Sequence, residues 1–242
     1  MYKRQVVIDS TKLKKYDVIT LDAANHKAIV SDTKLSGRYE SGTPTIAYPQ
    51  SIEMYGTSYA ISDTAAASFA DLKLGDYITL LFNTDKEVVA AYPKSVVSAD
   101  MQGIVTAVKE STATVSLING LTLRDLTVTS EKDLSSLQGR LVTVSQDSSG
   151  KAYLTQRTLS GKVSGNWSIE EGKLGDRLVS PQAQIYEEVL SGAPLCTIQT
   201  SDIVQTTVPS NQIRYTVTDS AGTVVCIILG DVTGESLSLI HI

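Results

Sequence analysis

Apolar and polar residues alternate with a period of two along much of this chain. In the stretch "IRYTVT" at 213–218, Ile213, Tyr215 and Val217 alternate with an arginine and two threonines. Turn residues at 219–222 separate this stretch from a second β-branched run that begins at Val224. Because successive side chains of a strand point to opposite faces, the pattern predicts a hairpin with one half-solvated strand and one more deeply buried strand.

The same pattern recurs four more times, in segments rich in Thr, Val and Ile, which suit a pleated sheet. The turns of these hairpins are expected at 23–27, 83–87, 110–112 and 146–151. Helix signals are sparse. One helix is expected from Asp63 or Thr64 to Gly75, and another from Ser130 to Gly139. The predicted fold is all-β, with tandem small β-barrel or sandwich modules built from antiparallel hairpins and one or two short helices.

The hairpins group into three expected modules. These are β module 1 at 6–98, a small barrel-like module 2 at 99–158 and β module 3 at 159–236, and fusion of the last two into one domain is the alternative. The phrases "LSGRYESG" at 35–42 and "LSGKVSGN" at 159–166 echo each other and suggest a tandem repeat.

Composition and charge narrow the function classes. The chain is 42% hydrophobic and 19% charged with a net charge of −5, which indicates a folded protein without a basic surface for nucleic acid. Its longest apolar run, at 224–230, is too short to span a membrane. The two cysteines, Cys196 and Cys226, are either a pair or, as we expect, two small buried residues.

The sequence contains few residues in arrangements suited to catalysis, so we expect no enzyme activity, no cofactor and no metal. His26 falls in a predicted turn, where a solvated side chain is expected. The adjacent carboxylates Glu170–Glu171 and Glu187–Glu188 would point to opposite faces of a strand and so make no acid/base couple.

Aromatic residues offer one candidate binding site. Exposed rings stack on sugars, and the candidates for such glycan stacking are Trp167, Tyr48, Tyr55 and Tyr59. The alternative, which we favour, is that these rings fill small β cores with their polar atoms at the rim.

Several phrases carry a family resemblance. They are "YDVITLDAANHKAIVSD" from Tyr16, "SFADLKLGDYITLLFNTDKEVVAAYP" from Ser68, "MQGIVTAV" from Met101, "INGLTL" from Ile118, "QAQIYEEV" from Gln182 and "YTVTDSAGTVVCIILGDVTG" from Tyr215. The chain thereby resembles the β-rich extracellular segments of bacterial surface proteins that contain S-layer-homology domains. The resemblance implies an exported, wall-associated protein anchored by repeats elsewhere, and it carries no functional residues.

The two ends read differently from the rest. "MYKRQ" at 1–5 and "LSLIHI" at 237–242 resemble translations of the two strands of one transposon adapter used in sequencing. We therefore expect both ends to be non-native and 6–236 to be a piece of a longer protein. On this hypothesis His241 is no metal ligand, and any leader or wall anchor lies outside the piece.

The expected function is a non-catalytic spacer or display segment at the cell surface. Its expected partners are neighbouring domains of the same chain, cell-wall polysaccharide or other surface subunits, with no nucleic acid and no membrane span. The alternatives are a module that binds carbohydrate or cell-wall glycan, as an adhesin does, and an accessory β region of a secreted hydrolase.

Overall fold

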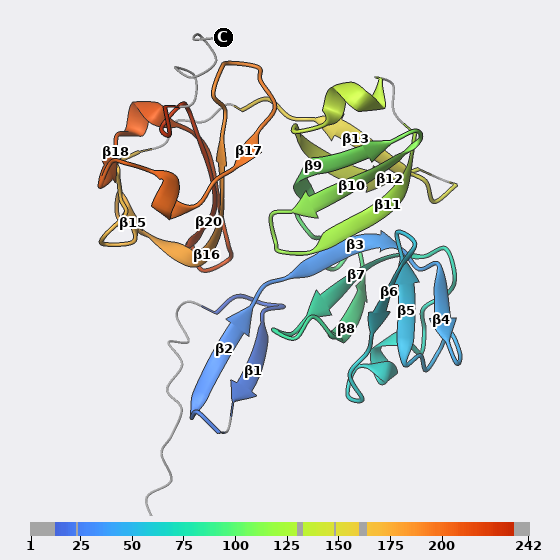
Figure 1. The fold of residues 1–242 in the computed structure, drawn as a ribbon. Coiled ribbons are helices and arrows are strands. Elements are labelled where there is room, and N and C mark those ends of the chain that lie inside the picture. Colours follow the sequence, from blue (N-terminus) through green and yellow to red (C-terminus); the bar gives the residue numbers. More distant parts are fainter. Residues whose placement is uncertain (1–12, 23, 130–132, 148, 160–163, 235–242) are drawn as a thin grey trace, which may run out of the picture.

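The computed structural model describes residues 13–22, 24–129, 133–147, 149–159 and 164–234, and these form an almost entirely β structure (Figure 1). The adapter-like ends at 1–5 and 237–242 lie outside the described residues. The predicted fold class is confirmed, because the strands form antiparallel hairpin sheets and one small closed barrel. All five predicted hairpins are present.

The N-terminal region contains a separate hairpin and two small sheets. The hairpin pairs β1 (Val18–Asp22) with β2 (Lys27–Ser31). One sheet has the order β3-β7-β8, with bounds Lys34–Arg38, Tyr77–Phe82 and Val88–Pro93. The other has the order β4-β5-β6, with bounds Ser41–Thr43, Ser51–Met54 and Thr57–Ala60.

The barrel closes in the order β10-β11-β13-β12-β9. Its strands are β9 (Gln102–Lys109), β10 (Thr112–Leu117), β11 (Thr122–Thr129), β12 (Leu141–Gln146) and β13 (Ala152–Gln156). The third and fifth of these strands, β11 and β13, run parallel, and the other neighbours run antiparallel. All five strands fall within the segment 99–158 for which a barrel was expected.

The C-terminal module is one twisted sheet of seven strands, in the order β18-β14-β15-β16-β20-β19 with β17 paired to β16. Its strands are β14 (Trp167–Ser168), β15 (Lys173–Leu174), β16 (Arg177–Glu187), β17 (Cys196–Thr197), β18 (Thr207–Val208), β19 (Ile213–Thr218) and β20 (Val224–Leu229). Two short 3₁₀ helices, η4 (Thr200–Asp202) and η5 (Ser210–Gln212), connect its strands.

Both predicted helices are wrong in extent. The segment 63–75 contains only the 3₁₀ helix η2 (Ala66–Phe69), and the described residues 133–139 contain only η3 (Leu134–Leu137). Each connection needs only one turn, which buries a single large side chain, Phe69 or Leu137. The expected cap Ser130 lies outside the described residues, and the Asp133 side chain caps η3 instead.

The buried apolar side chains form separate clusters. One continuous cluster runs from the N-terminal sheets, through Met101, into the barrel interior. The C-terminal module has a separate core around Trp167, Ile213 and Ile227. The N-terminal sheets and the barrel therefore share one core.

Candidate functional site

The barrel lies between the N-terminal sheets and the C-terminal module, and contacts both (Figure 1). The contact with the C-terminal module, which we call the apolar joint, is a third hydrophobic cluster. Its buried members are Ile104, Ile118 and Leu141 from the barrel with Tyr186, Cys226 and Ile228 from the C-terminal module. Burial raises the pKa of both the Cys226 thiol and the Tyr186 hydroxyl to about 12, so both stay protonated at neutral pH.

Hydrogen bonds surround the apolar joint. The Tyr215 hydroxyl donates to Gln102 Oε1 at 2.9 Å, and Gln184 Nε2 donates to the Leu117 carbonyl at 2.9 Å. The backbone N–H of Leu195 donates to the Gly139 carbonyl at 2.7 Å. The loop after β16 is thereby fixed to the turn between η3 and β12.

The contact between the N-terminal sheets and the barrel, which we call the shared-core joint, combines the continuous core with part-buried hydrogen bonds. The Ala99 N–H donates to Ser36 Oγ at 2.7 Å, and the Arg38 N–H donates to Gln146 Oε1 at 2.6 Å. Ser36 is only 1% exposed, so its hydroxyl needs partners, which are the Ala99 N–H and the Thr79 hydroxyl, 2.7 Å away.

A third contact joins the base of the β1–β2 hairpin directly to the C-terminal module. The Ser220 N–H donates to Asp32 Oδ2 at 2.7 Å, and the Ser220 hydroxyl donates to Asp17 Oδ1 at 3.1 Å. Burial, together with the nearby Asp32 carboxylate, raises the pKa of Asp219 in the same turn. The three parts of the chain therefore form a closed set of contacts.

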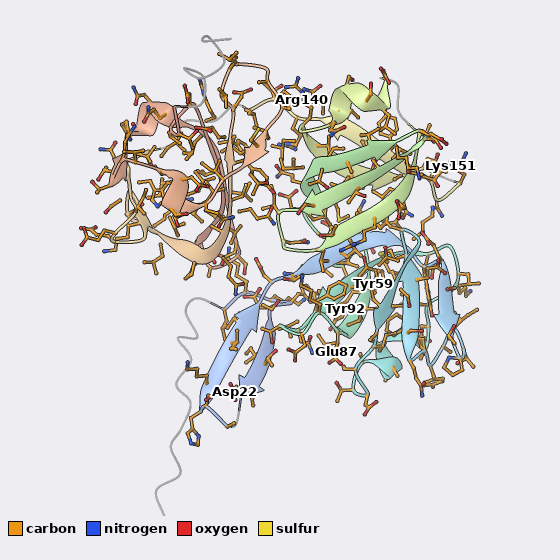
Figure 2. All side chains as sticks on the ribbon, viewed as in Figure 1. Asp22, Tyr59, Glu87, Tyr92, Arg140 and Lys151 are labelled. Carbon is orange, nitrogen blue, oxygen red and sulfur yellow. The ribbon has the colours of Figure 1, made fainter. Side chains whose placement is uncertain are left out.

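Several clefts lie along these contacts, and two of them are lined by charged side chains from more than one part of the molecule. The larger of these two, of about 670 Å³, lies where all three parts meet and has a mixed lining whose polar members include Asp32, Lys86, Asn119 and Gln182. The smaller, of about 440 Å³, lies beside the apolar joint and is lined by Arg140, Arg157 and Arg214 together with Glu188. Figure 2 shows Arg140 at the margin between the barrel and the C-terminal module. Clefts of these volumes at domain boundaries are of the size that small ligands occupy.

The barrel has the strand order of the oligonucleotide- and oligosaccharide-binding fold, in which the face of the second and third strands binds the ligand. Here that face, on β10 and β11, carries mainly hydroxyl side chains such as Thr112, Thr114 and Thr127, with the single basic residue Arg124. Tyr153 is the only aromatic residue in 99–158. The face lacks the aromatic rings and basic groove that bind single-stranded nucleic acid.

The residues predicted for glycan stacking do not form one surface. Tyr55 and Tyr59 lie in the N-terminal core at 5% and 9% exposure, and Trp167 lies in the C-terminal core at 2%. Tyr48 alone is open, at 61%. Tyr59 packs edge-on against Phe82, with ring centroids 5.4 Å apart, and burial raises its pKa to about 12. The three buried rings therefore have no open face for a sugar in this structure.

One of the two acidic pairs, Glu187–Glu188, serves a structural role. Glu187 is 1% exposed, and its carboxylate accepts the N–H groups of Val232 and Thr233 and the Thr233 hydroxyl. Glu188 Oε1 accepts the Gly192 N–H at 2.8 Å. The other pair, Glu170–Glu171, lies in a turn after β14, so the expectation that it lies on a strand is wrong.

The histidine and the two cysteines lie apart. His26 lies exposed at the tip of the β1–β2 hairpin, as expected for a turn. Both cysteines are free, with Cys226 buried and Cys196 exposed, so the expectation of two buried cysteines holds for one of them. Within the described ranges, no three His, Cys, Asp or Glu side chains gather as metal ligands, and no helix is long and apolar enough to cross a membrane.

Comparisons with known proteins add little. No family model and no curated protein matches the chain. Among solved structures, it is similar to a multidomain protein with nucleic acid binding domains from Streptococcus pneumoniae TIGR4, with 12% identity over 82% of this chain and 73% of that one. The TM-score is 0.22, so this likeness carries no inference about fold or function.

Proposed function

We propose that this chain is a non-catalytic structural segment of a bacterial cell-surface protein, in which three β parts act as one stiff spacer. The observation that carries the proposal is the closed set of contacts among the three parts. Domains within a chain move relative to one another unless their interface is large and hydrophobic. Here a continuous core, an apolar joint and the Ser220 contact oppose such motion.

The use of the polar side chains supports a structural role. The buried Glu187 and Ser36 accept backbone N–H groups, and the Cys226 thiol is held protonated. Residues used in this way stabilise the fold and leave no free base or activated nucleophile at these positions.

Small-angle X-ray scattering of the chain in solution tests the stiffness. A single rigid arrangement predicts a scattering profile that matches the structure at low and high salt. A profile that fits only an ensemble of separated modules would contradict the proposal. Thiol labelling gives an independent readout, because the exposed Cys196 should react quickly while Cys226 stays protected in the apolar joint.

The location at the cell surface rests on the resemblance to S-layer-homology-domain proteins, and the neighbouring coding sequence tests it. Wall-anchoring repeats in the same reading frame would support an extracellular spacer that contacts the cell wall or other surface subunits. An uninterrupted cytoplasmic enzyme there would contradict it, and a secreted hydrolase domain would favour the accessory-region alternative.

A second candidate function, a binding module, is favoured by the arginine-lined cleft beside the apolar joint. Stiff spacing and binding are compatible, because a cleft between two fixed parts keeps its shape. The buried positions of Trp167, Tyr55 and Tyr59 favour a site built from charge and hydrogen bonds over one built from aromatic stacking.

A further inference from the structure

Three arginines from separate parts of the sequence line the cleft beside the apolar joint. Arg140 precedes β12, Arg157 follows β13, and Arg214 lies on β19 of the C-terminal module. The chain as a whole is acidic, with a net charge of −5, so this concentration of positive charge is local. We call this site the arginine cleft.

The guanidinium groups are not neutralised by partners within the described residues. Arg140 Nη1 donates to the Ala193 carbonyl at 2.9 Å, and Arg157 Nη1 contacts Thr143 Oγ1 at 3.4 Å. Neither acceptor carries a charge, and the ion pair found in the described part of the chain, Lys34–Asp17, lies elsewhere. Each arginine has five N–H donors, so most remain free for a ligand.

The positive charges of the three guanidinium groups repel one another. A bound anion attracts each of them and so offsets this repulsion. Glu188 is also in the lining, but one of its oxygens already accepts the Gly192 N–H, and one carboxylate does not balance three guanidinium groups. The planar fork of arginine matches the oxygens of carboxylate and phosphate groups, often with two parallel hydrogen bonds. The cleft therefore has the positive charge and the hydrogen-bond donors that an oxyanion site requires.

We propose that the arginine cleft binds an oxyanion, either a sugar carboxylate or a phosphate ester, carried by a small ligand or a polysaccharide. The neutral hydroxyl groups in the lining, on Thr158 and Ser191, suit the hydroxyl groups of a sugar. The lining contains no aromatic residue on which a nucleobase would stack, which disfavours nucleic acid. This site is independent of the spacer function proposed above.

The test is titration calorimetry of the whole chain with inorganic phosphate, polygalacturonate, a neutral glucan and a single-stranded RNA oligonucleotide. We expect saturable binding of phosphate or polygalacturonate that weakens with added salt, and none of the glucan. A preference for polygalacturonate assigns the natural group as a sugar carboxylate, and a preference for phosphate assigns it as a phosphate ester.

The variants Arg157→Gln and Arg214→Gln should each weaken binding about tenfold, because each loses a charge-assisted hydrogen bond. Both side chains are exposed, so folding should be unaffected, and circular dichroism checks this. Arg177→Gln, which changes an exposed arginine on β16 outside the cleft, is the matched control and should bind like the parent.

Three results would overturn the proposal. They are no saturable binding of either oxyanion at millimolar concentration, an equal loss in Arg177→Gln, and oxyanion binding that survives both cleft substitutions. The last would place the oxyanion site elsewhere on the chain.

Discussion

The two joints of the barrel are built differently. The shared-core joint merges the N-terminal sheets and the barrel into one continuous cluster of buried side chains, reinforced by part-buried hydrogen bonds at Ser36 and Gln146. The apolar joint is a separate patch, and the C-terminal module keeps its own core behind it. A shared core makes two modules unfold together, whereas a patch between two complete cores permits one module to detach first.

Two adjacent isoleucines on β20 belong to different hydrophobic clusters, so substituting each tests whether the apolar joint is separate from the C-terminal core. Ile227 belongs to the C-terminal core and Ile228 to the apolar joint, and both are fully buried. Replacing either with Ala should lower the free energy of unfolding of the C-terminal module by about 2–5 kcal/mol. Hydrogen exchange should distinguish them, because Ile228→Ala also removes contacts to the barrel and should speed exchange in β9. Identical exchange patterns in the two variants would refute the separation.

Gly139 tests the apolar joint through the backbone. Its φ is +70°, and a Cβ there would lie 2.5 Å from Pro194 Cβ. Gly139→Ala should therefore combine backbone strain with a steric clash between the barrel and Pro194 of the C-terminal module. Together these should weaken the docking of the C-terminal module onto the barrel by about 2–4 kcal/mol. Gly120, with φ +85° and no atom within 4 Å of such a Cβ, is the matched control and should cost only about 1–2 kcal/mol.

Thiol labelling measures the effect at Gly139. Cys226 lies in the apolar joint and should label faster in Gly139→Ala than in Gly120→Ala, while the exposed Cys196 labels rapidly in both. Equal rates for Cys226 in the two variants would mean that the contact with Pro194 does not hold the joint closed.

The local pattern of apolar, polar and turn residues predicted the hairpins well, but it did not predict the two joints of the barrel. Alternation and turn residues located all five hairpins, because strand pairing across a short turn is a local property. The shared-core joint depends on Ser36 meeting Ala99, and the apolar joint on Ile104 meeting Ile228. These contacts join residues that are far apart in the sequence, so no periodic pattern of residues predicts them.

The candidate site was hidden for the same reason. Trp167 and Tyr59 were candidates for glycan stacking because they are aromatic. The alternation of apolar and polar residues does not show which face of a strand another element covers. Arg140, Arg157 and Arg214 meet only through the docking of two modules. The available signal was a set of arginines in an acidic chain, without any regular spacing.

The Ser220 contact, which bypasses the barrel, should respond to pH. Because the pKa of Asp219 is raised in the folded state, its charge destabilises the fold at neutral pH, and stability should fall as pH rises from 3.8 through the folded pKa. Asp219→Asn should therefore raise the melting temperature at neutral pH, and the gain should vanish below pH 3.8.

Asp133→Asn provides the control of opposite sign for Asp219. Hydrogen bonds from Ser135 lower the pKa of Asp133, so its charge stabilises the fold above pH 3.8. The variant should lose stability at neutral pH, and the loss should vanish as pH falls through the lowered folded pKa. Melting curves that shift in the same direction for both variants would contradict the assignment of Asp219.

The β1–β2 hairpin presents a third apolar face, and it should give the smallest effect. Ile19 and Val30 pair across this face, and Leu21 beside them is 69% exposed. Leu21→Thr keeps a residue that favours strands and should change the free energy of unfolding by less than about 0.5 kcal/mol in urea. A larger loss that grows with protein concentration would show that another copy covers this face in solution, and sedimentation velocity would detect that pairing. The β1–β2 face would then bury apolar side chains between two copies of the chain, whereas the two joints of the barrel bury them within one copy.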